Sequence, residues 1–272
     1  MYDTLVFSGG GVRCFSYVGA LAAIHMRHHD FLSEITQCVG ASAGSIVAAM
    51  VATRHTIDQM IKMSINLDPS SLVDVDVLKF LSGWGINDTK NIRRWLSVYI
   101  PEDLTFHDVW RRYRCNLEIM TLNVTSGEEV VFSHKSHPSI HVLDVIIASC
   151  SLPLIFPPSK IDGDIHVDGG VLSPIPVKAE DIPRLMKKKT LIFRVPGWSK
   201  SPIDRVDRYI MALIKIMTTK IAKFHIDLWE SKIDTVNIMV DVGIIDLEID
   251  KARIMSIIST GIQTMNSFLT PP

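Results

Sequence analysis

Alternating short apolar runs and helical patterns fill the first fifty residues. The apolar run at residues 4–7 is followed by glycines, which predicts a buried strand ending in a turn. Residues 15–26 have apolar positions three and four apart and predict a helix, and residues 35–39 predict a second strand. Residues 42–53 are almost wholly apolar, which is typical of a helix buried on all sides. This order predicts an α/β fold with a parallel sheet.

The middle of the chain is predicted to be mostly helical up to residue 112, with helices beginning near residues 57, 89 and 105. Thr105, followed three residues later by Asp108, has the spacing of a helix cap. Beyond it we expect strands at residues 117–122 and 130–132, a short helix at 142–150, and a hairpin at 160–167.

The last third is predicted to contain strands at residues 191–195 and 235–240 and a final helix at 251–268. Residues 203–229 have an apolar stripe at helical spacing, which favours a helix that covers the core; lipid-surface or partner contact stays an alternative. No repeat, low-complexity tract or linker interrupts the chain. We therefore expect one domain over residues 1–272, with a motif core at 4–176 and helices of 203–268 covering the sheet.

Composition narrows the class of protein. The chain is 47% hydrophobic and 21% charged, with a mean hydropathy of +0.24, so we expect a large core and some apolar surface. The net charge of -1 argues against a nucleic-acid partner. Four scattered cysteines without CxxC spacing predict buried, reduced thiols and no metal site. The oligomeric state is not constrained by the sequence.

Targeting signals are not evident. The start at Met1-Tyr2-Asp3 lacks a basic region, so no signal peptide is expected. No uncharged apolar run reaches the ~18 residues that a membrane-spanning helix needs. These features favour an intracellular, cytoplasmic protein, with peripheral membrane contact as a further option.

Three consecutive glycines, Gly9, Gly10 and Gly11, follow the first predicted strand. Their bare backbone N–H groups can converge on an anion. A dinucleotide site is not favoured, because its third glycine would fall at Cys14, and no Lys-Ser/Thr pair follows for a phosphate loop. An oxyanion hole built from these amides, with Arg13 nearby, remains the preferred interpretation; a purely geometric glycine turn is the alternative.

The second predicted strand ends in Gly40-x-Ser42-x-Gly44, the spacing of a nucleophile elbow. The residues two before and two after such a serine must be small, because they nearly touch in the tight turn. Ser42 is therefore the candidate nucleophile, and it needs a group that accepts its proton.

The preferred proton acceptor is Asp168, followed by Gly169 and Gly170, because two glycines let a carboxylate reach past bare backbone. A free aspartate has a pKa near ~4 and is a weak base, but burial beside an apolar pocket would raise that pKa. His166 is the alternative base; a place on the same strand face as Asp168 explains its spacing equally well.

These motifs together resemble those of the patatin-like phospholipases. They occur in the order Gly9-Gly10-Gly11-x-Arg13, Gly40-x-Ser42-x-Gly44, Ala148-Ser149-x-Ser151-Leu152-Pro153-x-x-Phe156-Pro157-Pro158, and Asp168-Gly169-Gly170. The segment Asn123-Val124-Thr125-Ser126-Gly127 is also similar, and the resemblance runs from about residue 4 to 176. Cys14 is a departure, since the family usually has glycine after the basic residue.

The resemblance implies a three-layer fold, with a mostly parallel central sheet and helices on both faces. It implies a Ser42–Asp168 dyad without histidine, an oxyanion hole at Gly9 to Gly11, and calcium-independent hydrolysis of phospholipid or lysophospholipid acyl esters. No cofactor or metal is implied, and the partner would be a lipid at a membrane or lipid-droplet surface. An acyltransferase or transacylase, a small-ester carboxylesterase, and a non-catalytic lipid-binding or partner-recruiting protein are the alternatives.

Overall fold

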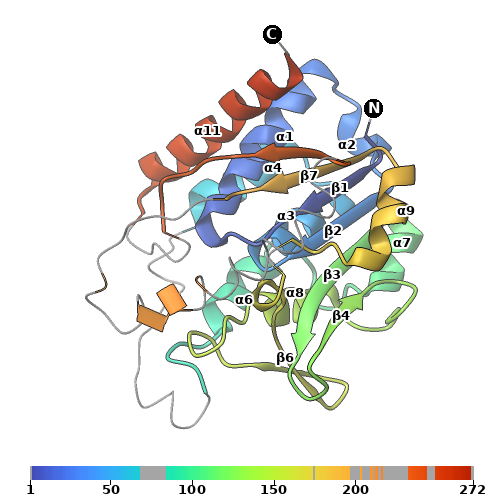
Figure 1. Ribbon diagram of the computed structural model, residues 1–272, viewed down its shortest axis with the longest axis vertical. Coiled ribbons are helices and arrows are strands. Elements are labelled where there is room, and N and C mark those ends of the chain that lie inside the picture. Colours follow the sequence, from blue (N-terminus) through green and yellow to red (C-terminus); the bar gives the residue numbers. More distant parts are fainter. Residues whose placement is uncertain are drawn as a thin grey trace.

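One mixed sheet forms the centre of the molecule (Figure 1). The computed structural model describes residues 2–67, 84–173, 175–196, 232–243 and 249–270, with a few isolated positions between 203 and 216. Within these ranges the sheet has eight strands in the order β5-β6-β3-β2-β1-β7-β8, with β4 also paired to β3. They are β1 (Thr4–Phe7), β2 (Gln37–Ala41), β3 (Asn116–Asn123), β4 (Glu128–Phe132), β5 (Ser159–Ile161), β6 (Asp164–Asp168), β7 (Thr190–Arg194) and β8 (Asp234–Asn237).

The centre of the sheet is parallel, as predicted: β2 and β7 flank β1, β3 follows β2, and β8 follows β7. The antiparallel pairs lie at one side, where β4 and β6 pair with β3 and β5 pairs with β6. Parallel neighbours require crossover connections. The helices between residues 15 and 34 lie in the connection from β1 to β2, and those between residues 43 and 113 lie in the one from β2 to β3.

The helices begin and end within a few residues of the predicted positions. They are α1 (Phe15–Arg27), α2 (Phe31–Glu34), α3 (Ala43–Ala52), α4 (Ile57–Asn66), α6 (Lys90–Ser97), α7 (Phe106–Tyr113), α8 (Val142–Ser149), α9 (Ile182–Lys187) and α11 (Lys251–Leu269). The cap predicted at Thr105 and Asp108 is present as a reciprocal capping box at the start of α7. The short helices α2 and α9 were not predicted. The helix predicted over residues 203–229 lies outside the described residues, apart from isolated positions.

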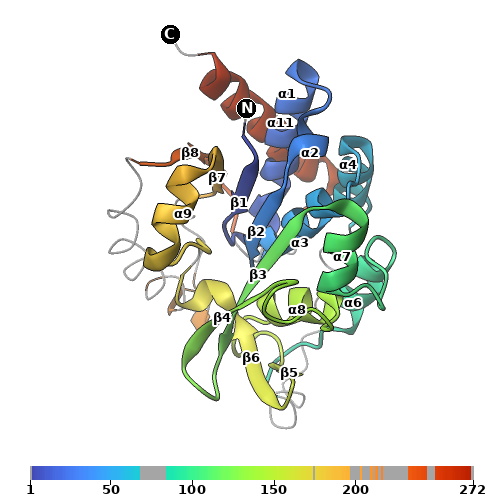
Figure 2. The same ribbon diagram turned by 90° about the vertical axis from the view of Figure 1, so that its right-hand side faces the viewer.

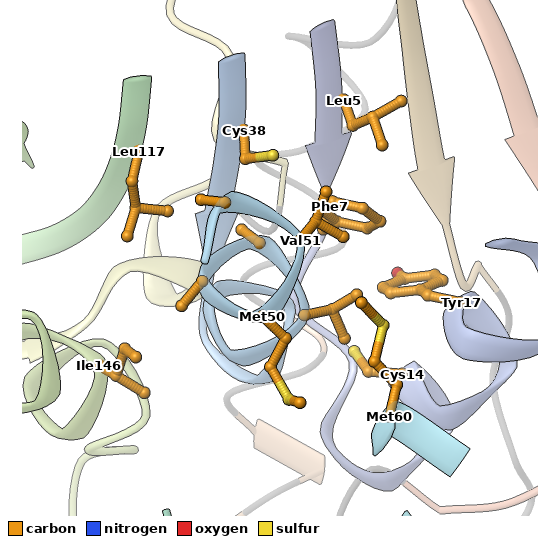
Figure 3. Close-up of a cluster of buried hydrophobic side chains, with 14 of the residues drawn as sticks. Leu5, Phe7, Cys14, Tyr17, Cys38, Met50, Val51, Met60, Leu117 and Ile146 are labelled. Atoms are coloured by element: carbon orange, nitrogen blue, oxygen red, sulfur yellow. The ribbon is translucent and has the colours of Figure 1, made fainter. Parts of the chain in front are cut away.

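Alternate side chains of the central strands point to opposite faces of the sheet. Leu5 and Phe7 belong to the larger core, which α3 fills with small and branched apolar side chains (Figure 3). Val6 points the other way and packs with Ile182 and Leu185 of α9. Figure 2 shows α9 on one side of the strands and α1, α3 and α4 on the other. The prediction of a three-layer arrangement is confirmed.

The C-terminal helix α11 packs closely along α1 (Figure 1). Two glycines allow the contact: a Cβ added to Gly261 would lie 1.9 Å from the carbonyl oxygen of Ser16, and one added to Gly19 would lie 1.9 Å from that of Ile258. Both carbonyl oxygens belong to the helix backbone. They cannot move away from an added Cβ unless the two helices separate. In the described part of the chain, no helix is long and apolar enough to cross a membrane.

We predict that Gly261→Ala lowers the free energy of unfolding by at least about 2 kcal/mol, because the added methyl group forces α1 and α11 apart. Ser259→Ala, an exposed position on the same helix, is the matched control and should change stability by less than about 0.5 kcal/mol. Urea denaturation measures both. Equal, small effects would mean that α11 does not pack against α1 in this way.

Candidate active site

Two strands bring Ser42 and Asp168 together along one edge of β3. Ala41, the last residue of β2, is paired with Met120, and Asp168, the last residue of β6, is paired with Thr121. The opposite edge of β3 is taken by β4. Because β2 runs parallel to β3 and β6 runs antiparallel to it, their final residues approach each other end to end.

Ser42 lies in a strained turn between β2 and α3, with φ 52° and ψ −138°. A Cβ on Gly40 would approach the Cα of Ser45 to 2.6 Å, and one on Gly44 would approach the carbonyl oxygens of Phe7 and Ser8 to 2.5 Å. Only glycine fits at either position while the turn keeps this shape. The predicted elbow geometry is therefore present, and it places Ser42 before the positive end of the α3 dipole.

The side chains of Ser42 and Asp168 are hydrogen-bonded. Ser42 Oγ donates to Asp168 Oδ2 at 2.6 Å, and the amide of Gly170 donates to Asp168 Oδ1 at 2.7 Å. The second glycine of the triplet thus has a direct role, because its amide fixes the carboxylate orientation. Gly169 leaves room for the chain to pass β3: a Cβ there would lie 2.4 Å from the carbonyl oxygen of Met120.

Burial makes Asp168 an unusually strong base for an aspartate. The residue is fully inaccessible to solvent, and this desolvation raises its pKa to about 7, although hydrogen bonds from Ser42 and Gly170 oppose the rise. At neutral pH the carboxyl group is close to half-protonated. It is therefore a better proton acceptor than a free aspartate, and it can still give the proton back near neutral pH.

The last residue of α8 and the turn that follows it hold the backbone of Ser42 and Asp168. Ser149 Oγ accepts a hydrogen bond from the amide of Ser42 at 2.8 Å and donates to the carbonyl of Met120 at 2.7 Å. The carbonyl of Ser151 accepts a hydrogen bond from the amide of Asp168 at 3.0 Å. The sequence motif contained both serines, but sequence reasoning gave them no role because nothing along the chain shows which backbone groups they reach.

The glycine loop faces Ser42 across the end of the sheet. Gly11 and Ser42 line the same pocket. Arg13 is buried, and its Nε and amide donate to the carbonyl of Gly10, each at 3.3 Å. Because C=O and N–H point in opposite directions in a trans peptide, the Gly11 amide is directed away from Arg13. No acceptor among the described residues binds that amide, so it can serve an oxyanion.

Cys14 is buried directly after the glycine loop and is one of the residues that line the pocket. The residue ends the short 3-10 helix η1 (Gly11–Cys14), and its thiol donates to the carbonyl of Ser8 at 3.7 Å. Burial raises the pKa of the Cys14 thiol to about 12, so the side chain stays neutral. With Cys14 in place of the family's usual glycine, Gly11 still lines the pocket beside Ser42.

A largely apolar pocket of about 130 Å³ lies beside Ser42. Helices α1, α3, α4 and α6 and the segment after α8 contribute its walls, among them Phe15, Val47, Met63, Ile92, Leu152 and Phe156. The helical patterns of α4 and α6 were read from the sequence, but their contribution to this pocket was not foreseen. An apolar chain attached to a carbonyl group at Ser42 fits such a lining.

His166 is not the partner of Ser42. Its Nδ1 lies 2.9 Å from the hydroxyl of Thr121, and its ring packs edge-on against Phe132. Desolvation lowers its pKa. The alternative base considered from the sequence is therefore a buried side chain bonded to β3. Within the described ranges, no group of three or more His, Cys, Asp or Glu side chains is placed to hold a metal ion.

The sequence also matches the model of a known protein family. The sequence model of the patatin-like phospholipases matches residues 5–181. The chain belongs to the patatin-like phospholipase family. This is a family of lipid hydrolases that includes lipases and lysophospholipases.

Relatives within the family are distant. "Probable lipid hydrolase 463L" of Invertebrate iridescent virus 6 is 26% identical over 186 residues, which are 65% of this chain and 62% of that protein. "1-acylglycerol-3-phosphate O-acyltransferase Pnpla3" of Mus musculus is 28% identical over 186 residues, 65% of this chain and 42% of that protein. The matched part thus spans less than two thirds of either relative.

A solved structure shares the patatin-like fold. VipD from Legionella pneumophila superimposes with a TM-score of 0.64 at 16% identity, over 98% of this chain and 66% of that chain. At this identity the likeness shows the fold alone. It agrees with the central sheet and flanking helices described above.

We predict that Asp168→Asn is more stable than the wild type above neutral pH. The pKa of Asp168 is raised on folding, so the folded state keeps its proton while the unfolded carboxyl loses it, and stability falls as pH rises from about 4 to about 7. The amide variant escapes this loss, worth up to about 4 kcal/mol at pH 8.

Denaturation of both proteins at several pH values measures the effect. The stability difference should shrink toward zero below about pH 4. A difference independent of pH would contradict the raised pKa of Asp168.

Proposed function

We propose that the chain is a lipid acyl hydrolase of the phospholipase A or lysophospholipase type, a serine carboxylic-ester hydrolase that forms an acyl-Ser42 intermediate. The observation that carries this proposal is the 2.6 Å hydrogen bond between Ser42 Oγ and Asp168 Oδ2 at the edge of an apolar pocket. The pocket takes the acyl chain, and the ester carbonyl lies at Ser42.

In the first half-reaction, Ser42 Oγ attacks the ester carbonyl carbon while its proton passes to Asp168. The carbonyl oxygen becomes an oxyanion, which the amides of Gly10 and Gly11 stabilise. Collapse of this intermediate breaks the bond to the leaving alcohol, which takes the proton from Asp168. Removing one such amide interaction typically costs roughly 3 kcal/mol in the barrier.

In the second half-reaction, water replaces the alcohol. Asp168 accepts a proton from the water, whose oxygen attacks the acyl carbon. Release of the fatty acid returns the proton to Ser42 Oγ. A carboxyl with a pKa of about 7 is matched to both directions of transfer. Base and oxyanion donors both come from the chain, so we propose that calcium is not needed.

An acyltransferase or transacylase is the second candidate, since it differs only in the acceptor of the acyl group. The mouse relative is named as an acyltransferase, which supports this second candidate function. A small-ester carboxylesterase would use the same pair of residues. A non-catalytic lipid-binding or partner-recruiting protein is less well supported, because both Ser42 and Asp168 are retained and hydrogen-bonded.

We also propose that the whole chain is one domain. The family match ends at residue 181, yet α11 (Lys251–Leu269) packs on α1 (Phe15–Arg27) through the Gly19 and Gly261 contacts. A further proposal is that the lipid substrate is met at a membrane or lipid-droplet surface.

We predict that a fluorophosphonate probe labels Ser42 of the folded protein and that Ser42→Ala abolishes labelling. Peptide mass spectrometry locates the adduct. Asp168→Asn is the companion variant: it keeps Ser42 but cannot take the proton, so labelling should slow by at least about 100-fold. Labelling at another residue, or none in the folded wild type, would overturn the assignment.

Product analysis then separates the candidate activities. Phospholipid, lysophospholipid, triacylglycerol and a short-chain ester are incubated with and without EDTA and with an acyl acceptor. Hydrolysis yields free fatty acid at the same rate in EDTA, whereas a transacylase yields acylated acceptor in excess over fatty acid. Loss of activity in EDTA would contradict calcium independence.

We predict that Ser149→Ala lowers kcat/KM by at least about tenfold, because it leaves the buried amide of Ser42 without an acceptor. Ser151→Ala is the matched control on the same turn. Among the described residues, its hydroxyl bonds the carbonyl of Ile147 alone. The carbonyl that holds Asp168 is unchanged in this variant. Equal losses in the two variants would show that Ser149 has no special role in positioning Ser42.

A further inference from the structure

Two large apolar side chains lie exposed beside the pocket. The side chains of Trp84 and Leu154 are 61% and 42% exposed. Both residues have left-handed backbone conformations, with φ 62° and 68°, which are rare for bulky side chains. Such outliers persist only where the surrounding structure holds them in place.

Backbone contacts hold the two residues next to each other. Gly85 and Leu154 form an isolated parallel bridge. The amide of Ile86 donates to the carbonyl of Leu154, and that of Asn87 donates to the carbonyl of Ile155, both at 3.0 Å. Gly85 is in close contact with the chain opposite, since a Cβ there would lie 2.4 Å from the nitrogen of Pro157. Trp84 directly precedes this paired segment and Leu154 belongs to it, so the two residues lie on segments that the contacts hold together. We name the pair the 84/154 edge.

The 84/154 edge is continuous with the wall of the pocket. Leu152 and Phe156 line the pocket together with Ser42. The amides of Ile155 and Phe156 both donate to the carbonyl of Leu152, which closes a tight turn with Leu154 in it. This turn presents Leu154 to solvent, while Leu152 and Phe156, two residues before and after it, line the pocket.

We propose that the 84/154 edge inserts into an uncharged or zwitterionic lipid surface and sets the pocket mouth against it. This inference rests on the proposed function, because the acyl chain must leave a lipid phase to reach Ser42. With the edge inserted, that chain enters the pocket without crossing water. Tryptophan suits this position, since its ring is apolar and its N–H can reach the head-group level.

A lipid surface fits better than a protein partner. Two side chains fall far short of the ~800 Å² per partner of a standard protein interface, whereas a few inserted apolar side chains are enough for reversible membrane contact. Electrostatic attraction is not needed, because the net charge of the chain is only -1. Binding should therefore depend on apolar insertion and change little with salt.

The test is sedimentation with phosphatidylcholine vesicles, using Ser42→Ala as the background so that binding is measured without turnover. Into it we place Trp84→Asn and Leu154→Asn, separately and together, because asparagine tolerates the left-handed backbone. Met26→Ser is the matched control, since Met26 is 58% exposed near the far end of α1.

The Asn variants should each weaken vesicle partitioning by about tenfold, as expected when a large apolar side chain no longer leaves water. Met26→Ser should bind like the background protein, and raising the salt concentration should alter binding by less than about twofold. No vesicle binding by the background protein, or equal binding by all variants, would overturn the proposal.

Kinetics with Ser42 intact separate this proposal from the proposed function. In the Asn variants, hydrolysis of a soluble short-chain ester should stay within about twofold of wild type, while hydrolysis of vesicle phospholipid falls about tenfold. Equal loss on both substrates would show damage to the site and overturn the docking role. If the Asn variants lose vesicle binding but the wild type has no esterase activity, the proposed hydrolase function is contradicted while the docking role of the 84/154 edge stands.

Discussion

The hydrogen bond between Ser42 and Asp168 depends on the register of three strands. β2 ends beside Met120 and β6 ends beside Thr121, on the same edge of β3. A shift of one residue in either pairing would turn the side chains of that strand to the opposite face of the sheet. The site is thus a property of the sheet, and the large core beneath it keeps the register fixed.

The same arrangement opposes stability in two ways. Ser42 is held at a positive φ, a conformation that costs of order 1–3 kcal/mol for such residues. Asp168 is held in a fully buried place, where its charged form is disfavoured. The glycine contacts, the turn after α8 and the packing of α3 together offset both of these unfavourable free energies. In return, the serine lines the pocket, and the Asp168 carboxyl bonded to it has a pKa of about 7.

Much of the fold and the candidate nucleophile could be predicted from the sequence, because both depend on residues that are close together in the chain. The helices and strands follow from apolar spacing, and Ser42 from the small residues that surround it. The two glycines after Asp168 made it the preferred proton acceptor of Ser42, and the family resemblance implied the same pair. That the two side chains meet depends on the pairing of β2 and β6 with β3. The role of Ser149 could not be predicted, since its two bonds reach β3 and the β2–α3 turn. The pocket walls from α4 and α6 depend on tertiary packing, and α2 and α9 are too short to show a period.

The most direct measurement is a crystal structure of the fluorophosphonate adduct, because the phosphonyl group imitates the tetrahedral intermediate. The account predicts the adduct on Ser42 Oγ, with the phosphonyl oxygen about 2.7–3.1 Å from the amides of Gly10 and Gly11 and the Asp168 carboxyl beside Oγ. An adduct whose phosphonyl oxygen points away from the glycine loop, or a histidine ring in the place of Asp168, would contradict it.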